Sequence, residues 1–422
     1  MNTTSGLWQG RAYVLWLISD TAKGLGGSLF GFALPLIALF LTDDPVAAGI
    51  VGAVSLTLRL ICTLGGGWAA DRFHRIGLMI AGALLSFLLA ALLLGLTVTD
   101  NLAFSSLLVV TSLMSVRGGL FDVAGESALK DLVPAHQVGR AQATNQGRDA
   151  VLQLLGGPLG GFLLGAGIWV LAAVMTLSQA VSALFAVLLG RRVSRHGYAG
   201  TQPESAPQGT GGMKQALSWL LHRREIRQIL FVFTAINLGF GTGMTTVIYS
   251  LQQEGYSAAQ IGLLSFWLGV SMLLGAMVSP KLIDRFPVGP LSVAGLALAT
   301  AGFVLVPFMH TLPAIIATLA VCTVLIPLVN AGLLGYFMVA TPTSMLGRAN
   351  SIVQFLAMMA APLAPLVAGI GLVQIGRTGT LLLSAAVCVL ATLMAGLDRG
   401  ARGIPRAPEW PAYAEKFEVR VS

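Results

Sequence analysis

The chain has 422 residues, of which 55% are hydrophobic and only 10% are charged. This composition excludes an ordinary water-soluble enzyme, because the apolar fraction exceeds that of globular proteins. The formal net charge of +8 does not indicate a nucleic-acid-binding protein, because most Lys and Arg residues fall in tails or in short connectors between apolar runs.

Apolar runs of about 20 residues recur along the chain, and each is long enough to cross the hydrocarbon core of a bilayer. Backbone polar groups find no water there, so the runs must be helices. The first half is expected to hold spans at about 12–41, 46–70, 76–97, 102–128 and 142–164, and a sixth that ends near 190. The second half is expected to hold spans at about 228–250, 259–281, 288–309, 312–338, 349–374 and 377–397.

These spans predict an all-α membrane protein with twelve transmembrane helices in two pseudo-symmetric six-helix bundles, residues 1–190 and 228–397. Between the bundles, residues 191–227 form a predicted cytoplasmic linker, which is flexible at 196–212 and ends in a short amphipathic helix. Residues 398–422 form a predicted cytoplasmic tail. Lys and Arg dominate the connectors on one side, so the positive-inside rule places both termini in the cytoplasm. We expect a monomer.

Two sequence motifs recur in the second half of the chain. An Asp-Arg-Phe sequence within 65–75 has a counterpart within 279–286, and a proline followed by Gly-Arg-Ala occurs at 134–141 and again at 342–349. The two motifs recur at nearly the same separation, which indicates a duplicated half. Internal repeats of this kind are typical of secondary transporters, whose substrate sites lie near the bilayer midplane between the repeats.

Charged residues occur inside the predicted spans of the first half. These are Asp20, Lys23, Arg59, Arg117 and Asp122. An ionisable group at mid-bilayer costs about 2.5–3.5 kcal/mol, so its presence is a hypothesis of function. We expect Asp20 to be the protonatable group of a central cavity with Arg117 beside it. Arg117 and Asp122 are five positions apart, so we expect them to face different ways. The competing interpretation is a structural ion-pair cluster that ties three helices together.

The connector between the second and third predicted spans is a candidate cytoplasmic gate. Asp71 lies at a helix end, where it can meet the positive N-terminus of another helix. The two arginines that follow can pair with Glu126 or Asp122 of the fourth span, and such contacts would break when the inside opens. The alternative is that the arginines serve only to orient the chain. The predicted gate comprises Gly67, Asp71, Arg72, Arg75, Glu126, Asp284 and Arg285.

The fifth predicted span contains the motif Gly157-Pro158-x-Gly160-Gly161. A proline among glycines allows a helix to bend or to pack closely against a neighbour, and both interpretations stay open.

Several motifs resemble those of a known family. Gly67-x-x-x-Asp71-Arg72-x-x-Arg75 is similar to the loop 2–3 signature of the major facilitator superfamily. The glycine motif of the fifth span resembles the one that efflux branches of this family carry in helix 5. Segments 257–262 and 345–350 are similar to the second half of bacterial siderophore (enterobactin-type) and macrolide exporters. The resemblance covers almost the whole chain.

The resemblance implies a secondary active, proton-coupled exporter in the bacterial cell (inner) membrane. Such an antiporter would move a small organic compound, such as a siderophore, drug or metabolite, by alternating access, with protons and membrane lipid as its other partners. The alternative is an importer or facilitator of a small anionic or zwitterionic solute, because the intramembrane charges lean positive. A more remote alternative is a membrane sensor that has lost transport.

We expect neither an enzyme nor a cofactor or metal. All five histidines fall in loops or at helix ends, and the three cysteines are far apart in apolar runs. No sequence with the pattern of a nucleotide-binding P-loop occurs, so ATP is not expected to drive this chain.

Overall fold

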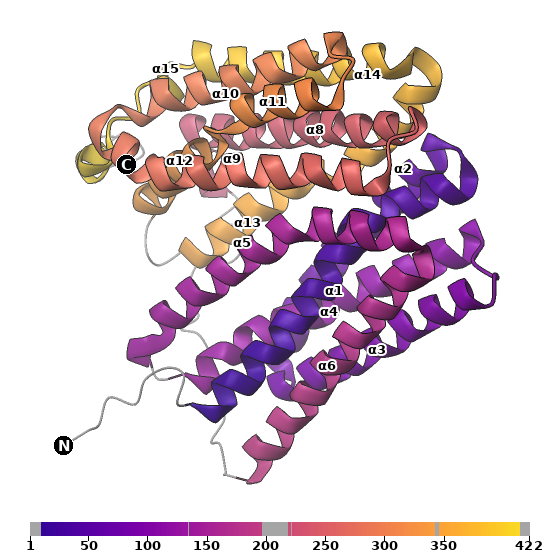
Figure 1. The fold of residues 1–422 in the computed structure, drawn as a ribbon. Coiled ribbons are helices and arrows are strands. Elements are labelled where there is room, and N and C mark those ends of the chain that lie inside the picture. Colours follow the sequence, from indigo (N-terminus) through magenta and orange to yellow (C-terminus); the bar gives the residue numbers. More distant parts are fainter. Residues whose placement is uncertain (1–9, 134, 196–217, 221, 342–345, 414–422) are drawn as a thin grey trace. The chain divides into compact units, whose positions relative to one another are not determined.

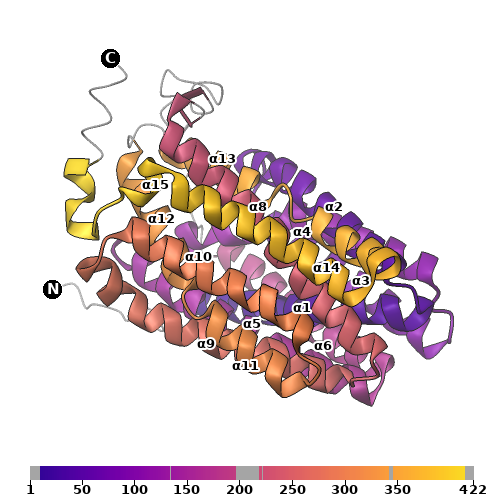
Figure 2. The ribbon, with the colours of Figure 1, turned by 90° about the horizontal axis from the view of Figure 1, so that it is seen from above.

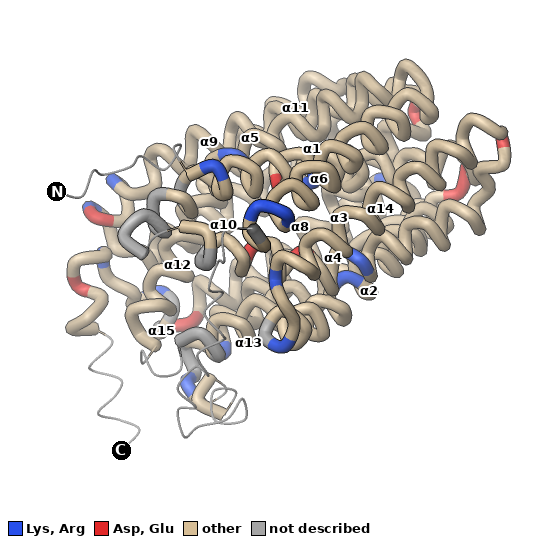
Figure 3. The backbone as a smooth tube through the Cα atoms, turned by 90° about the horizontal axis from the view of Figure 1, so that it is seen from below, with Lys and Arg blue, Asp and Glu red and all other residues tan. Residues whose placement is uncertain are grey.

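The computed structural model describes residues 10–133, 135–195, 218–220, 222–341 and 346–413, and all regular secondary structure in these ranges is helical (Figure 1). Within them, 11 helical stretches are long and apolar enough to cross a membrane. Figure 3 shows long stretches of helix that carry no charged residue. The predicted fold class, an all-α membrane protein, is confirmed.

The chain divides into two compact units, and the first comprises residues 1–206 and 252–265. Its first six helices are α1 (Arg11–Thr42), α2 (Pro45–Arg72), α3 (Arg75–Val98), α4 (Phe104–Leu132), α5 (Ala135–Ala166) and α6 (Ile168–Arg195). Most of their ends lie within a few residues of the predicted spans. The exception is α5, which begins at Ala135 instead of near 142, because the polar stretch before the apolar run continues the same helix.

Helix α1 contacts α2, α4, α5 and α6, so it lies in the middle of the first unit (Figure 1). The Oγ atom of Ser19 donates a 2.9 Å hydrogen bond to the carbonyl oxygen of Ser182 and joins α1 to α6. Helices α2 and α4 cross where Gly66 lies against the carbonyl oxygen of Gly119. Small residues and hydrogen bonds are the usual means by which transmembrane helices pack. This packing brings α1, α2 and α4 close enough for their charged side chains to meet.

The second unit comprises residues 207–251 and 266–422. Its longer helices are α8 (Arg224–Gln253), α9 (Ala258–Arg285), α10 (Val288–Leu305), α11 (Leu312–Thr323), α12 (Ile326–Ala340), α13 (Leu346–Met358) and α14 (Leu363–Leu397). The ends of α8 and α9 that flank the 252–265 segment belong to the first unit. Within the second unit, α14 lies along α10, as Figure 2 shows.

Several predicted spans of the second half are interrupted. The span at 288–309 ends in a 3-10 turn, η2 (Val306–Phe308), and the span at 312–338 is divided between α11 and α12 at Val324 and Leu325. Pro307 and Pro327 lie in or just after these breaks, and proline cannot donate the backbone hydrogen bond that a helix interior requires. The apolar pattern predicted the spans but not their interruptions.

The last apolar stretch, Ala349–Leu397, is 49 residues long. A helix of that length would measure roughly 70 Å, more than twice the thickness of a hydrocarbon core. It is divided between Met358 and Leu363, and again inside α14 at Gly376, whose φ is 70°. One continuous span is therefore excluded. Two spans here are consistent with the predicted total of twelve, which stays a prediction, as does the cytoplasmic location of the termini.

The described residues after α14, which end at 413, pack against the second unit. They include α15 (Arg399–Arg402) and the 3-10 turn η3 (Ala407–Glu409). Ile404 is 0% exposed and Trp410 is 9% exposed, and both join an apolar core with residues of α8, α10 and α12. We call residues 399–413 the C-terminal segment. The interpretation of 398–422 as a cytoplasmic tail stays a prediction.

Backbone hydrogen bonds attach the C-terminal segment to the start of α10. The first N–H groups of any helix lack a partner inside the helix. Here the N–H of Gly289 donates to the carbonyl oxygen of Ile404 at 3.0 Å, and that of Val288 donates to Pro405 at 3.4 Å. The indole Nε1 of Trp410 donates to the same Pro405 oxygen at 2.9 Å. The segment therefore caps α10 next to the connector that contains the second Asp-Arg motif.

The predicted flexible linker at 196–212 lies outside the described residues. So do residues 213–217 and 221 of the predicted amphipathic helix at 213–227, while 218–220 are helical and α8 begins at Arg224. The domain boundaries predicted from the sequence stay predictions.

Candidate functional site

The first unit contains a cluster of charged side chains from four helices. We call it the charge cluster, and its members are Asp20 and Lys23 of α1, Arg59 of α2, Arg117 and Asp122 of α4, and Arg148 of α5. Every one of these residues lies inside a stretch that is apolar enough to cross a membrane. Charges at such depth are costly unless they are paired, and their pairing is the first property of the site to establish.

Asp20 is paired through both of its carboxylate oxygens. Its Oδ1 lies 2.7 Å from Lys23 Nζ, one turn along α1, and its Oδ2 lies 2.6 Å from Arg148 Nη2 on α5. Asp20 is only 5% exposed. A carboxylate that is nearly closed off from solvent must be compensated in this way, because an unpaired buried charge costs several kcal/mol. Asp20 therefore joins α1 to α5.

Asp122 is also contacted by cations, but at longer distances. Its Oδ1 lies 3.0 Å from Arg117 Nη1 and 3.6 Å from Lys23 Nζ, and its Oδ2 lies 3.7 Å from Arg59 Nη2. The Asp122 side chain is 21% exposed and that of Arg59 is 63% exposed. Lys23 lies between the two acids and contacts both. The charge cluster is thus one connected network, closed around Asp20 and open around Asp122.

The pairing differs from the sequence-based expectation. Arg117 was expected beside Asp20, but it pairs with Asp122, although the two positions face different sides of α4. Five positions correspond to about 140° around a helix, yet the long arginine side chain bridges that angle. Gly118 helps, because it has no side chain in the space beside the Asp122 carboxylate.

Arg148 is the member that sequence reasoning missed. It lies inside the predicted fifth span, 142–164, and inside the apolar stretch of α5, yet it was not counted among the charges within the spans. The sequence signal was present, because Arg148 is followed almost at once by an uncharged run to Ala166.

Aromatic side chains support the Arg148 end of the charge cluster. The Trp16 indole donates a 2.9 Å hydrogen bond from Nε1 to the carbonyl oxygen of Gly125 on α4. The guanidinium of Arg148 lies 5.8 Å from the centre of the Trp16 ring, within the range of a cation–π contact. The Tyr13 ring stacks on the Trp16 ring, with 6.1 Å between the two ring centres. Trp16 therefore lies beside the charge cluster and contacts Arg148.

The predicted gate residues of α2 and α3 are placed only in part. The side chain of Asp71 lies outside the described part of the chain. Arg72 is exposed and stacks over Trp68, with its guanidinium carbon 5.4 Å from the ring centre. Arg75 begins α3, and a Cβ on Gly67 would meet no atom within 4 Å. It is Gly66, one position earlier, that makes the close helix contact.

The remaining predicted gate residues lie at helix ends or on exposed faces. Glu126 is exposed on α4, and Asp284 and Arg285 are exposed at the end of α9. Asp122, the other acid proposed to pair with the gate arginines, contacts Lys23, Arg59 and Arg117 instead. The gate stays a prediction.

The glycine motif of α5 lies in a crowded environment. A Cβ on Gly160 would meet Phe32 of α1, and one on Gly157 or Gly161 would meet residues at the start of α9, in the same compact unit. Pro158 lies between them, inside α5. These contacts favour the close-packing interpretation of the motif.

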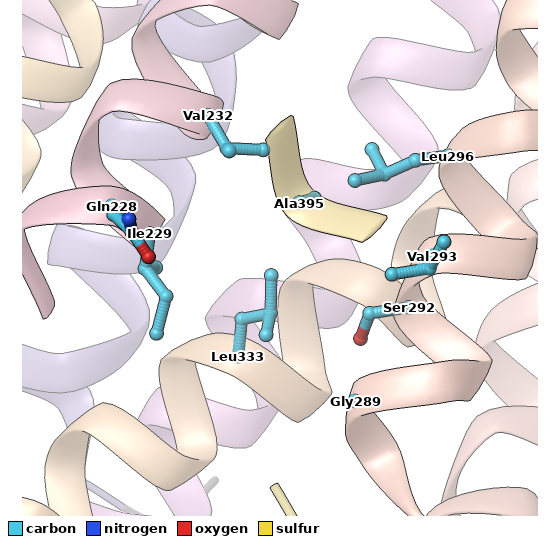
Figure 4. A pocket seen from close by; sticks show the side chains of 9 residues that line it. All are labelled: Gln228, Ile229, Val232, Gly289, Ser292, Val293, Leu296, Leu333 and Ala395. Atoms are coloured by element: carbon cyan, nitrogen blue, oxygen red, sulfur yellow. The ribbon is translucent and has the colours of Figure 1, made fainter. Parts of the chain in front are cut away.

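A pocket in the second unit differs sharply in chemistry from the charge cluster. Figure 4 shows Val232, Leu296 and Leu333 pointing into it from different helices. The polar members of its lining are Gln228 and Ser292, and its other residues are apolar or glycine. In the described part of the chain, no group of three or more His, Cys, Asp or Glu residues is placed to hold a metal ion. The charge cluster is therefore the candidate site.

A family model for the Major Facilitator Superfamily matches residues 18–365 and, in a second match, 233–416. The chain belongs to the major facilitator superfamily. It is accordingly a multi-pass integral membrane transporter and not an enzyme. No curated protein matches the sequence.

Two solved structures of transporters share the fold. A bacterial homologue of the iron transporter ferroportin, crystallised in its inward-facing state, has a TM-score of 0.70 and 14% identity, with 94% of this chain and 100% of that chain covered. A D-xylose-proton symporter has a TM-score of 0.60 and 18% identity, with 92% of this chain and 99% of that chain covered. At these identities the likeness concerns the fold alone, and the resemblance to siderophore and macrolide exporters stays a prediction.

Proposed function

We propose that this superfamily member is a proton-coupled exporter. It would exchange protons for a small organic compound, such as a siderophore, drug or metabolite, by alternating access across the inner membrane of a bacterial cell, as a monomer. The observation that supports this proposal is the pairing of Asp20, a buried carboxylate within a membrane span, with cations from two helices. A transporter that uses the proton gradient needs such a carboxylate.

Asp20 is placed where one proton would change helix packing. Its ion pair with Arg148 joins α1 to α5, and its pair with Lys23 lies along α1. Protonation would remove the negative charge that holds both cations. The freed Lys23 and Arg148 would then turn to water, to substrate or to Asp122. A proton on Asp20 and a rearrangement of α1 and α5 are therefore coupled, and this coupling is the requirement for proton-driven alternating access.

A second candidate function has support from the composition of the charge cluster. Lys23, Arg59, Arg117 and Arg148 outnumber Asp20 and Asp122. An importer or facilitator of an anionic or zwitterionic solute would also place an excess of cations in its cavity. One of the structural neighbours is a proton symporter, and the fold accommodates either direction of transport.

The proposal includes a cytoplasmic gate that opens and closes during transport. We assign to it Gly67, Asp71, Arg72 and Arg75 around the α2–α3 connector, Glu126 on α4, and Asp284 with Arg285 at the end of α9. The recurrence of an Asp-Arg pair at two helix ends supports the assignment, because orientation by positive charge alone requires no acids.

The test uses inverted membrane vesicles that contain the full-length protein and a pH-sensitive dye. The vesicles are energised and candidate cationic, neutral and anionic compounds are added in turn. We expect one compound class to release protons from the wild type. Asp20→Asn should lose this response, whereas Asp149→Asn, a change at a 52% exposed acid next to Arg148, should keep it. Proton release at the wild-type rate in Asp20→Asn would remove Asp20 from coupling and favour the structural interpretation of the cluster.

A further inference from the structure

The two acids of the charge cluster are held very differently. Asp20 has two contacts of 2.6 and 2.7 Å and is 5% exposed. Asp122 has three contacts of 3.0, 3.6 and 3.7 Å, and its side chain is 21% exposed. Only the shortest of these three lies well within the range of a charge-assisted hydrogen bond. Asp122 is therefore surrounded by cations that it does not fully engage.

The arginines around Asp122 retain unused hydrogen-bonding capacity. The Arg59 side chain is 63% exposed, and its contact with Asp122 is too long for a direct hydrogen bond. Charged groups inside transmembrane bundles almost always face the bundle interior or a water-filled cavity, so we infer that the exposed Arg59 side chain faces such a cavity. The buried Nε of Arg117 has no hydrogen-bond partner among the described atoms. A buried donor of this kind calls for an explanation, and a bound ligand supplies one.

We propose that Lys23, Arg59 and Arg117 form a subsite for an anionic group of the transported compound, of the carboxylate class. Asp122 is its internal counter-ion, which occupies the subsite when no ligand is bound and is displaced by the ligand. This inference rests on the proposed transport function and assigns the substrate class. The planar guanidinium fork matches a carboxylate through two parallel hydrogen bonds, which a lone lysine cannot provide.

Displacement of Asp122 is feasible because its side chain is short and partly exposed. The tethered carboxylate nevertheless competes with any free anion. A short tether gives an effective concentration in about the millimolar range or above. Simple anions should therefore bind the wild type weakly, and removal of the Asp122 charge should strengthen their binding. If Asp122 were needed only to hold the cluster together, removal of its charge should instead weaken anion binding.

The test measures binding of citrate, used as a tricarboxylate probe, to the purified full-length protein in detergent at constant ionic strength. The midpoint of thermal unfolding is followed against citrate concentration, because a ligand of the folded state raises it. We expect Asp122→Asn to bind citrate about tenfold more tightly than the wild type. In Arg59→Gln, citrate should raise the unfolding midpoint little or not at all. Asp149→Asn, which removes an exposed acid outside the subsite, should match the wild type.

Equal citrate affinity in the wild type and Asp122→Asn would overturn the proposal, as would a stabilising effect of tetramethylammonium in place of citrate. If Asp122→Asn does not fold, Arg59→Gln decides, because a 63% exposed side chain is not needed for folding, and unchanged citrate binding in it overturns the subsite. The assay requires neither a proton gradient nor transport. Failure of proton coupling in vesicles therefore leaves this result intact, and the absence of citrate binding leaves proton-driven export standing.

Discussion

The Nη2 atom of Arg148 lies 2.6 Å from Oδ2 of Asp20, so that α5 and α1 are joined by an ion pair between residues 128 positions apart. Both side chains are largely buried, at 14% and 6% exposed. Contacts between residues that are close in the sequence do not account for this ion pair. It exists because α1 and α5 pack against each other where Asp20 and Arg148 lie within their spans.

Arg148→Gln should destabilise the first unit. Loss of one partner leaves a buried carboxylate with a single cation, and breaking a buried pair costs about 3 kcal/mol. Thermal unfolding in detergent measures the effect, and a cycle with Asp20→Asn isolates the coupling, expected at about 0.5–3 kcal/mol. A cycle with Asp149→Asn serves as the control and should give a smaller coupling, because Asp149 is 52% exposed. Additive effects of Asp20→Asn and Arg148→Gln would contradict the structure.

Gly66→Ala should weaken the crossing of α2 and α4. A Cβ at position 66 would collide with the carbonyl oxygen of Gly119, and such overpacking costs about 1–3 kcal/mol. Gly67→Ala is the matched control, because its Cβ would meet nothing within 4 Å. Replacing glycine by alanine in an open helical position should be neutral or stabilising by up to about 1 kcal/mol. Unfolding temperatures that fall equally for both variants would argue against the observed packing.

Trp410→Ala should detach the C-terminal segment. The ring packs against Tyr336 with centroids 6.5 Å apart and covers Gly335, and truncation of a buried tryptophan costs about 3–5 kcal/mol. Limited proteolysis should then cleave within residues 399–413, where the wild type resists. Glu409→Gln removes only an exposed pair with Arg406 and should change stability by less than about 1 kcal/mol. Cleavage of wild type and Trp410→Ala at the same rate would refute the docking.

Gly376→Ala should be destabilising through backbone strain alone. Its φ is 70°, and an added Cβ would meet no neighbouring atom within 4 Å. With ψ at −178°, this backbone conformation is one that glycine adopts almost exclusively, and it costs another residue about 1–3 kcal/mol. Gly95→Ala, in an equally open but helical position of α3, lacks this strain and serves as the comparison. The same unfolding temperature in both variants would mean that Gly376 does not need its positive φ.

The helices could be predicted because an apolar run long enough to cross the membrane must also satisfy its own backbone hydrogen bonds, and only a helix does so within one segment. For that reason the run from Ala12 to Leu41 matches α1 closely. The interruptions could not be predicted in the same way. Val324 and Leu325 are apolar residues like their neighbours, so hydropathy does not mark the break, and Pro327 just after them is the sequence signal that the apolar pattern leaves out.

The membership of the charge cluster could be predicted better than its pairing. Asp20, Lys23, Arg59, Arg117 and Asp122 stand out because a charge inside an apolar run is rare. Which acid meets which base depends on side-chain reach and on helix contacts between distant segments. Sequence spacing contains neither kind of information, so Arg117 was assigned to the wrong carboxylate and Arg148, although inside the predicted fifth span, was not recognised as a member.

The C-terminal segment has a consequence for biosynthesis. Ile404 and Trp410 are made after every membrane span, yet they complete the same apolar core as Val288 and Leu333. Chains emerge at about 5–20 residues per second, and N-terminal parts fold first. The helices of the first unit that carry the charge cluster can therefore assemble while the ribosome is still at work. The core of the second unit closes only after residue 410 has emerged from the ribosome, so it completes later than the packing of the first unit.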